Sequence, residues 1–232
     1  MWYWLFKYIF MGPLLTLLGR PKVEGLEYVP DDGAVILASN HLAVADSFYL
    51  PLVVKRRITF LAKSEYFTGT GIKGWFQRWF YTVAGQVPID RTDADSAQAA
   101  LDTAARILNE GKLLGMYPEG TRSPDGRLYK GKTGLGRVAL NTGVKVIPVA
   151  MIGTDAVNPP GSKRWRFGRV TVRFGKPMDF SRFDGLEGNR FIERAVVDEV
   201  VYELMRLSGQ EYVDLYAADI KEGKQPSAEL VA

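Results

Sequence analysis

The sequence predicts an α/β fold: a single domain with a central, mostly parallel or mixed sheet flanked by helices, plus an N-terminal membrane-associating helix. Apolar runs of strand length alternate with stretches of helical periodicity along the chain, which is the pattern of an α/β protein. No linker divides the 232 residues, and a chain of this length can bury a full core. Residues 1–19 stand apart because nearly all of them are apolar.

We expect residues 1–19 to form an N-terminal anchor helix. The segment opens with aromatic residues between Trp2 and Tyr8, and rings with a polar edge prefer the headgroup layer of a membrane. It is slightly short for a span of roughly 20 residues and contains Pro13, so the expected helix lies at the interface and bends near that proline. A helix that caps the soluble core explains the same composition equally well.

The remaining elements follow from hydrophobic periodicity and from residues that begin or end helices. Asp46 begins one helix, Asn189 caps another, and Gly111, Gly143 and Gly209 are stop signals. The predicted strands are 34–39, 58–62, 86–90, 113–117, 144–152 and 169–175, and the predicted helices are 46–55, 93–110, 133–141 and 189–207. These elements place one folded domain at residues 20–218 and a disordered tail at residues 219–232.

Composition excludes several kinds of chemistry. The chain has no cysteine, which rules out disulfides, a thiol nucleophile and thiolate metal ligation. It has a single histidine, His41, which argues against a zinc or non-heme iron site, so we expect neither a metal nor a cofactor. The net charge of +4 suits anionic partners or simple solubility, but the basic residues do not gather into the strip typical of a nucleic-acid-binding protein.

The segment Asn40-His41-Leu-Ala-Val-Ala-Asp46 carries the clearest chemical pattern. On a regular helix, His41 and Asp46 would point in different directions, but at a junction of strand, loop and helix they can converge. Asp46 would then orient the imidazole while the second ring nitrogen faces a substrate hydroxyl. From these two residues alone, a helix-capping Asp46 beside a surface His41 remains the stronger reading.

Three further segments occur in a fixed order along the chain. Residues 117–123, YPEGTRS, follow a buried strand and combine a permissive glycine with an arginine suited to phosphate. Residues 85–91, GQVPIDR, put a second arginine just beyond a strand, and residues 146–149 form a strand with a proline bend. Each segment is weak evidence alone, and their order carries the argument.

In this order the segments resemble the glycerolipid acyltransferase family, of the 1-acyl-sn-glycerol-3-phosphate acyltransferase type. NHLAVAD (40–46) is similar to the family's histidine–x4–aspartate block, and GQVPIDR, YPEGTRS and VIPVAM (146–151) resemble its later blocks. The resemblance runs from about Gly25 to Pro177. The second block is the loosest match, because family members often carry an aromatic or aliphatic residue where Pro88 stands.

The resemblance implies roles for individual residues. His41 would act as general base on the acceptor hydroxyl, with Asp46 as its orienting partner. The residues expected to bind or shape the acceptor and its phosphate are Lys63, Arg91, Glu119, Gly120, Thr121 and Arg122, and Glu119 is a candidate to bond a glycerol oxygen. Backbone N–H groups near the helix after Asp46, or around Gly120, are the expected donors to the tetrahedral oxyanion.

The activity that the resemblance implies is O-acyl transfer from acyl-CoA or an acyl carrier protein to 1-acylglycerol 3-phosphate, giving phosphatidic acid. Glycerol 3-phosphate, a glycolipid or another lysophospholipid remain alternative acceptors, and a catalytically silent peripheral membrane protein is the alternative from another class. The expected partners are the lipid substrate, acyl-CoA and a membrane surface, with no nucleic acid. The expected location is the cytoplasmic face of the cell membrane, as a peripheral or monotopic protein.

Overall fold

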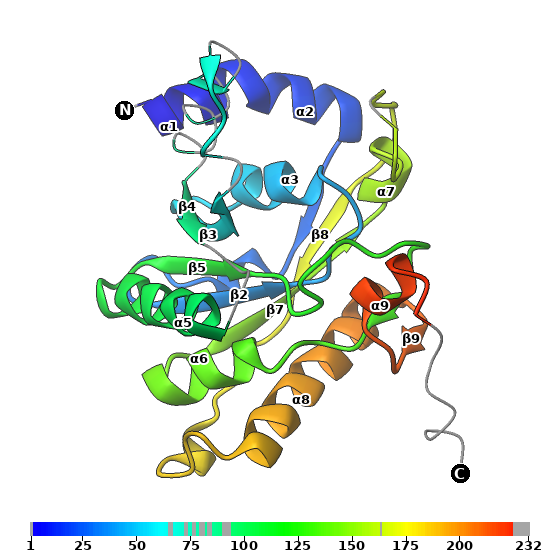
Figure 1. Ribbon diagram of the computed structural model, residues 1–232. Helices are drawn as coiled ribbons and strands as arrows, with labels where there is room; N and C mark the ends of the chain where they lie inside the picture. Colours follow the sequence, from blue (N-terminus) through cyan, green and yellow to red (C-terminus); the bar gives the residue numbers. More distant parts are fainter. Residues whose placement is uncertain are drawn as a thin grey trace.

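Seven strands form the central sheet in the part of the chain that the computed structural model describes, which is residues 2–64, 67–71, 74–75, 78, 82, 85–89, 94–162 and 164–224 (Figure 1). The strand order is β1-β8-β7-β2-β5-β3-β4, and every neighbouring pair is parallel except β7 with β8. The strands are β1 (Lys22–Glu24), β2 (Val35–Ser39), β3 (Ile58–Lys63), β4 (Gln86–Ile89), β5 (Leu113–Met116), β7 (Val146–Ile152) and β8 (Thr171–Phe174). The predicted mostly parallel, mixed sheet is confirmed.

Helices cover both faces of this sheet, because side chains alternate along its buried strands. In β2, Val35 and Leu37 pack in one core with α3 (Asp46–Val53), whereas Ile36 and Ala38 pack in the other. The second core is closed by α5 (Ala94–Asn109), α6 (Gly134–Thr142) and α8 (Arg190–Ser208), as Figure 1 shows. The predicted strands and helices agree with these elements to within about two residues at each end.

The N-terminal helix consists of α1 (Trp2–Leu5), a π-helical stretch η1 (Phe6–Met11) and α2 (Gly12–Gly19). The wide turns of η1 end at Met11, two residues before Pro13, whose missing N–H cannot continue an α-helical ladder. Gly12 follows η1 because a Cβ there would lie 2.4 Å from the carbonyl oxygen of Lys7. The predicted bend near Pro13 is therefore a change of helix type rather than a simple kink.

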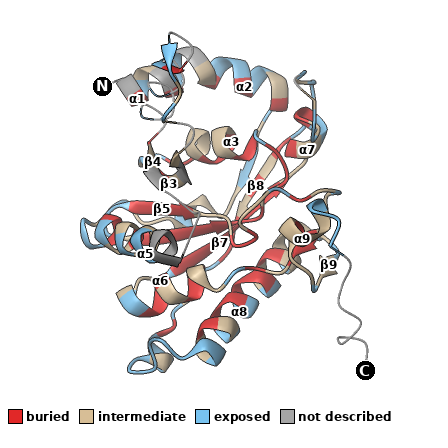
Figure 2. Ribbon diagram, in the orientation of Figure 1, coloured by how far each residue is buried: buried red, intermediate tan, exposed pale blue. Residues whose placement is uncertain are grey.

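One face of the N-terminal helix packs on α3. Tyr49 donates its hydroxyl to the carbonyl of Leu15 at 3.0 Å, and the Lys7 ammonium donates to the carbonyl of Val54 at 2.5 Å. The helix therefore caps the core, while its opposite face is exposed (Figure 2). Among the described residues, we find no helix whose length and apolar content suffice to cross a membrane.

The C-terminal part returns to the edge of the sheet where β2 and β5 end. Helix α8 begins at the Asn189 cap and ends at Gly209, as predicted. Beyond it, β9 (Tyr212–Val213) pairs with β6 (Leu128–Tyr129), and α9 (Ala217–Lys221) follows. The predicted start of a disordered tail at Asp219 is wrong, because this residue lies inside α9, and residues 225–232 lie outside the described residues.

The remaining elements are short: η2 (Leu26–Tyr28), α7 (Thr154–Val157) and η4 (Ser181–Phe183). Strands β1, β6 and β9, which span two or three residues each, are not predicted from the sequence. Strands this short carry no readable alternation of polar and apolar positions.

Candidate active site

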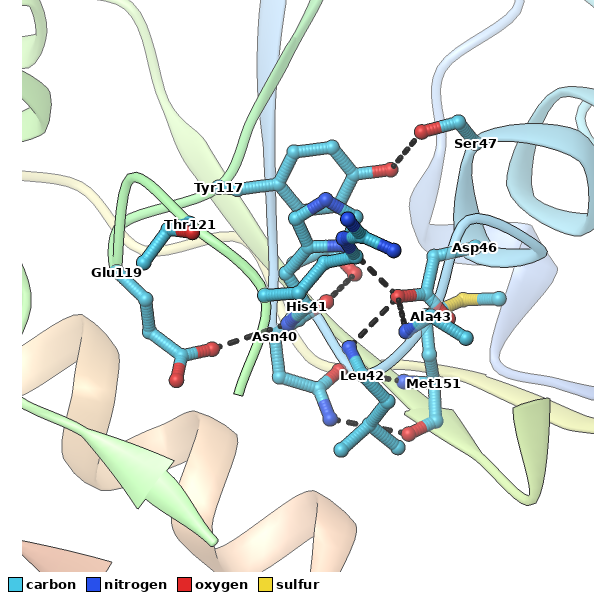
Figure 3. Close-up of polar contacts among 12 residues, drawn as sticks. Asn40, His41, Leu42, Ala43, Asp46, Ser47, Tyr117, Glu119, Thr121 and Met151 are labelled. Atoms are coloured by element: carbon cyan, nitrogen blue, oxygen red, sulfur yellow. Dashed lines mark hydrogen bonds and ion pairs between the residues drawn. The ribbon is translucent and has the colours of Figure 1, made fainter. Parts of the chain in front are cut away.

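The site begins where β2 ends, at a fully buried asparagine. The side chain of Asn40 accepts a hydrogen bond from the Met151 N–H at 2.7 Å and donates to the Met151 carbonyl at 3.0 Å (Figure 3). It also donates to Oε1 of Gln210 at 2.6 Å. These three bonds fix the point at which the chain leaves the sheet, so the next residue, His41, starts from a rigid position.

His41 and Asp46 converge across the loop between β2 and α3. Their Nδ1 and Oδ2 atoms are 2.8 Å apart, and the same carboxylate oxygen accepts the backbone N–H groups of Leu42 at 2.7 Å and Ala43 at 2.8 Å (Figure 3). The predicted convergence of the two side chains is confirmed. The predicted capping role is not, because Ala45 is the N-cap of α3 and the Asp46 side chain turns back into the loop.

This arrangement sets the tautomer of the imidazole. A carboxylate can only accept, so Nδ1 of His41 carries the proton and Nε2 keeps its lone pair. Within the described part of the chain, Nε2 has no hydrogen-bond partner. The Asp46 side chain is fully sealed and that of His41 is 15% exposed, so the imidazole is the member of the pair that a substrate can reach.

An aromatic stack supports the ring of His41. The ring of Tyr117 lies parallel to it with centroids 3.9 Å apart, and the Tyr117 hydroxyl is 3.0 Å from Oγ of Ser47. Phe60 stacks behind Tyr117 and has room because residue 115 is glycine: a Cβ there would lie 2.3 Å from the Phe60 ring. Burial raises the pKa of Tyr117 far above its ordinary value, so this side chain is neutral. Sequence reasoning missed Tyr117, although it opens the segment YPEGTRS at residues 117–123.

Glu119 joins the loop of His41 to the strand β6. Its Oε1 accepts the His41 N–H at 3.0 Å, and its Oε2 accepts the Tyr129 N–H at 3.1 Å. The residue is 1% exposed, and burial raises the pKa of its carboxyl group to about 7, against the lowering effect of these two bonds. This geometry favours a positioning role for Glu119 over the predicted contact with a glycerol oxygen.

The loop after Glu119 lies beside the catalytic pair. The Ser123 N–H donates to the carbonyl of His41 at 2.7 Å, which brings the neighbouring Arg122 next to the imidazole loop. Gly120 has a φ of +72°, which only glycine adopts without strain. Arg122 is exposed and Thr121 is half-buried, so both are open to a ligand.

Two of the predicted phosphate ligands stay predictions. Arg91 lies outside the described residues. Lys63 is the last residue of β3, where the backbone register pairs it with Ile89 of β4, but its side chain is not among the described ones.

Two backbone N–H groups in the region expected to bind the oxyanion are already bonded: that of Ser47 to the carbonyl of Val44, and that of Gly120 to the carbonyl of Tyr117. Which of the other N–H groups after Asp46 or around Gly120 serve the oxyanion stays a prediction.

The fold and the site place a histidine, bonded to a buried carboxylate, at the carboxyl end of the parallel strands and beside an arginine-bearing loop. Residues 20–152 match the model of the Acyltransferase family, and the chain belongs to this family. The catalytic pair and the Glu119–Arg122 loop both lie inside the matched region.

Curated relatives share this family and a common name. A chloroplastic 1-acyl-sn-glycerol-3-phosphate acyltransferase of Arabidopsis thaliana is 36% identical over 167 residues, which cover 71% of this chain and 45% of that protein. A 1-acyl-sn-glycerol-3-phosphate acyltransferase of Haemophilus influenzae is 35% identical over 74% of this chain and 70% of its own length. The chain thus spans about half the length of the Arabidopsis relative.

A solved structure has the same fold. The crystal structure of the 1-acyl-sn-glycerophosphate acyltransferase PlsC from Thermotoga maritima superposes with a TM-score of 0.61 and 30% sequence identity. The match covers 83% of this chain and 76% of that one, so it extends well beyond the segment that carries the catalytic pair.

Proposed function

We propose that this chain is an O-acyltransferase that moves a fatty acyl group from a thioester to the free hydroxyl of 1-acylglycerol 3-phosphate, giving phosphatidic acid. The observation that carries the proposal is the 2.8 Å contact between His41 and Asp46, which leaves Nε2 of the imidazole free beside the Arg122 loop. The names of the curated relatives support this acceptor.

The chemistry is a direct transfer. As the acceptor hydroxyl attacks the thioester carbonyl, Nε2 of His41 takes its proton, and Asp46 stabilises the resulting imidazolium. The tetrahedral intermediate then collapses: the carbon–sulfur bond breaks and the leaving thiolate takes the proton back from Nε2. A thioester is already activated, so the reaction needs no covalent enzyme intermediate. The protein contributes a positioned base, which raises the rate by roughly 10²–10⁴-fold, and the alignment of the two substrates.

A small, mostly apolar cavity lies close to the site, with room for a few water-sized groups rather than for an acyl chain. It lies between the N-terminal helix and α3 and has a volume of about 40 Å³. Ser47 lines it and also bonds to Tyr117, which stacks on His41, so the cavity lies two side chains away from the imidazole. The lining residues are mostly apolar: Tyr3, Lys7, Met11, Leu15, Ser47, Phe48, Pro51 and Leu52.

The exposed face of the N-terminal helix supports a peripheral membrane location. Large apolar side chains on this face point to solvent, whereas the opposite face is buried against the core. A single exposed apolar residue is common in soluble proteins, but a continuous exposed apolar face indicates an interaction surface. A positively charged residue, Arg20, ends the helix. The exposed apolar residues of this face are Trp4, Tyr8, Ile9, Leu14 and Leu17.

The activity is tested by offering labelled acyl-CoA or acyl carrier protein with 1-acylglycerol 3-phosphate, glycerol 3-phosphate and other lysolipids, and by identifying the products with mass spectrometry. We expect phosphatidic acid as the main product and a loss of at least about 10²-fold in the His41→Ala variant, which removes the base. Full turnover by this variant contradicts the mechanism. Tight liposome binding without transfer from either thioester indicates the silent peripheral protein instead.

The membrane location is tested with the double variant Leu14→Glu and Leu17→Glu, which places two charges on the exposed face of α2. We expect its binding to anionic vesicles to fall several-fold in a sedimentation assay, because placing a charged carboxylate in the apolar layer of the membrane is unfavourable. Phe191→Glu is the matched control, since Phe191 is 86% exposed but lies at the start of α8 on the other side of the sheet. Equal binding by all three proteins contradicts the proposed surface.

A further inference from the structure

The C-terminal segment after α8 contacts the catalytic loops, although it lies beyond the region matched by the family. Gln210 bonds to Asn40 and to the carbonyl of Gly126, and the backbone N–H of Lys130 bonds to the carbonyl of Leu215. These contacts carry α9 to the loop that holds Arg122. The segment therefore forms one wall of the site.

Lys221 of α9 reaches this loop with its ammonium group. The Nζ atom donates to Oγ1 of Thr121 at 3.1 Å and, through a short bond, to the carbonyl of Arg122. Both acceptors are neutral, so they leave the positive charge uncompensated, and one of the three N–H donors of the ammonium is still available. Among the described residues, no aspartate or glutamate forms an ion pair with Lys221, whereas Lys224, three positions on, pairs with Asp219 and Glu222.

Lys132 approaches the same loop from its other side. A Cβ on Gly120 would lie 3.1 Å from Cδ and Cε of Lys132 and 3.5 Å from its Nζ, so the lysine side chain runs along the glycine backbone. Within the described part of the chain, Lys132 also has no acidic partner in an ion pair. Three exposed cationic side chains thus surround one turn, and we call them the α9 cation cluster: Arg122, Lys132 and Lys221.

Neighbouring charges leave this cluster positive. Burial and the Arg122 guanidinium lower the pKa of Lys221, while Glu119 raises it. Glu119 compensates poorly, because burial raises its own pKa to about 7 and both of its oxygens are bonded to backbone amides. Lys224 and, to a smaller extent, Lys132 lower the pKa of the neighbouring Glu222, but Glu222 forms its ion pair with Lys224 and not with a member of the cluster. Cations held close together without an ion-pair partner favour a polyvalent anion, and a phosphomonoester with several acceptor oxygens and more than one negative charge fits best.

We propose that Lys221, assisted by Lys132, binds the phosphomonoester of the acceptor, so that α9 supplies a phosphate ligand from outside the region matched by the family model. The proposal rests on the proposed function for the identity of the acceptor, though not for the presence of the anion site. The phosphates of coenzyme A could bind to the same cations. The two sources are distinguished by which substrate, the acceptor or acyl-CoA, binds more weakly when Lys221 is replaced.

The test compares Lys221→Ala, Lys221→Arg and Lys132→Ala with the matched control Lys224→Ala. In Lys221→Ala, we expect the KM for 1-acylglycerol 3-phosphate and the inhibition constant of glycerol 3-phosphate each to rise about 10- to 100-fold, as for loss of one charged hydrogen bond. The KM for acyl-CoA stays within about 2-fold of wild type if the bound group is the acceptor phosphate. Lys221→Arg recovers part of the loss, Lys132→Ala shows a smaller effect, and Lys224→Ala behaves as wild type.

Three outcomes overturn the proposal. The first is an unchanged acceptor KM in Lys221→Ala. The second is a lower kcat and a lower melting temperature at constant acceptor KM, because this pattern indicates a purely structural contact. A rise in the KM for acyl-CoA alone assigns the site to the coenzyme instead. Calorimetric binding of 1-acylglycerol 3-phosphate without any acyl donor separates this proposal from the activity: weaker binding by Lys221→Ala supports the anion site even if the wild-type protein transfers no acyl group.

Discussion

At the residue scale, a single carboxylate oxygen organises the catalytic loop. Oδ2 of Asp46 accepts N–H groups from His41, Leu42 and Ala43. The two backbone bonds hold the loop around the carboxylate, and the third bond selects the imidazole tautomer whose Nε2 is basic. Asp46 thus shapes the backbone and orients the base at once, which explains its complete burial.

Asp46→Asn tests this double role. Asparagine retains an acceptor but loses the negative charge that stabilises the imidazolium, so kcat falls about 10²–10⁴-fold. The acceptor KM changes little, because a sealed side chain does not touch the substrate. Steady-state kinetics check this, with circular dichroism as the folding control. The double variant with His41→Ala is expected to be no slower than His41→Ala alone, since both act through the same imidazole, and additive losses contradict the pairing.

Glu119 gives the protein a pH-dependent stability. Burial raises the pKa of its carboxyl group from 4.5 to about 7, so between these values the folded protein holds a proton that the unfolded chain has lost. The stability of the wild type relative to Glu119→Gln therefore falls as the pH rises through this window, by on the order of 3 kcal/mol. Urea unfolding of both proteins at pH 5 and pH 8 measures the change, and a constant difference contradicts the assignment.

At the scale of elements, close approach between helices decides which glycines are required. Helices α6 and α8 pack so tightly that a Cβ on Gly136 would lie 2.3 Å from the carbonyl oxygen of Glu193. The N-terminal helix approaches α3 in the same way, because a Cβ on Gly19 would lie 2.2 Å from the Tyr49 hydroxyl. Both contacts place glycine against backbone or a fixed ring, where a larger residue has no room.

Two alanine variants of α6 separate space from helix propensity. Gly136→Ala forces α6 away from α8 and is expected to lower the free energy of unfolding by about 1–3 kcal/mol. Gly134→Ala is the matched control, because its nearest neighbour is a Leu101 methyl group at 3.9 Å, and it is expected to be stabilising by about 0.4–1 kcal/mol. Urea denaturation compares the two, and equal effects contradict the packing argument.

At the scale of the whole molecule, the site is assembled from segments far apart in the sequence. His41 follows β2, Glu119 follows β5, and Met151 belongs to β7, and these three strands are neighbours in the sheet. Parallel strands end at one edge, so the residues after them meet there. The C-terminal segment then connects to this edge through Gln210 and Lys221.

Variants of Asn40 and Gln210 test whether this long-range connection positions the base. Asn40→Ala leaves the N–H and carbonyl of Met151 without their side-chain partner in a buried position and is expected to cost about 2–4 kcal/mol of stability, together with a loss of kcat. Gln210→Ala removes bonds in a half-buried position and is expected to cost about 1 kcal/mol. Thermal melting and kcat are measured together, and an unchanged kcat in Asn40→Ala contradicts a positioning role.

Much of the fold follows from local sequence patterns. Strands such as β2 and β7 are continuous apolar runs, and α8 begins and ends at Asn189 and Gly209, where capping chemistry places its ends. The sequence could not predict β9 and α9, because two-residue strands and five-residue helices form only where a neighbouring loop supplies their partners. For the same reason the sequence does not reveal that Asp219 lies inside a helix.

The order of chemical groups along the chain predicted that His41 and Asp46 converge and that an arginine-bearing loop lies near them, and the resemblance to a family supplied the reaction that we propose for them. Only the tertiary structure decided how these groups are used. Glu119 accepts hydrogen bonds from two backbone N–H groups, and Tyr117 stacks on the imidazole. Lys221 reaches the loop of Thr121 from the C-terminal segment. The physical reason is that a sequence specifies which donors, acceptors and rings exist. Packing of distant elements specifies which of them remain free to meet a substrate.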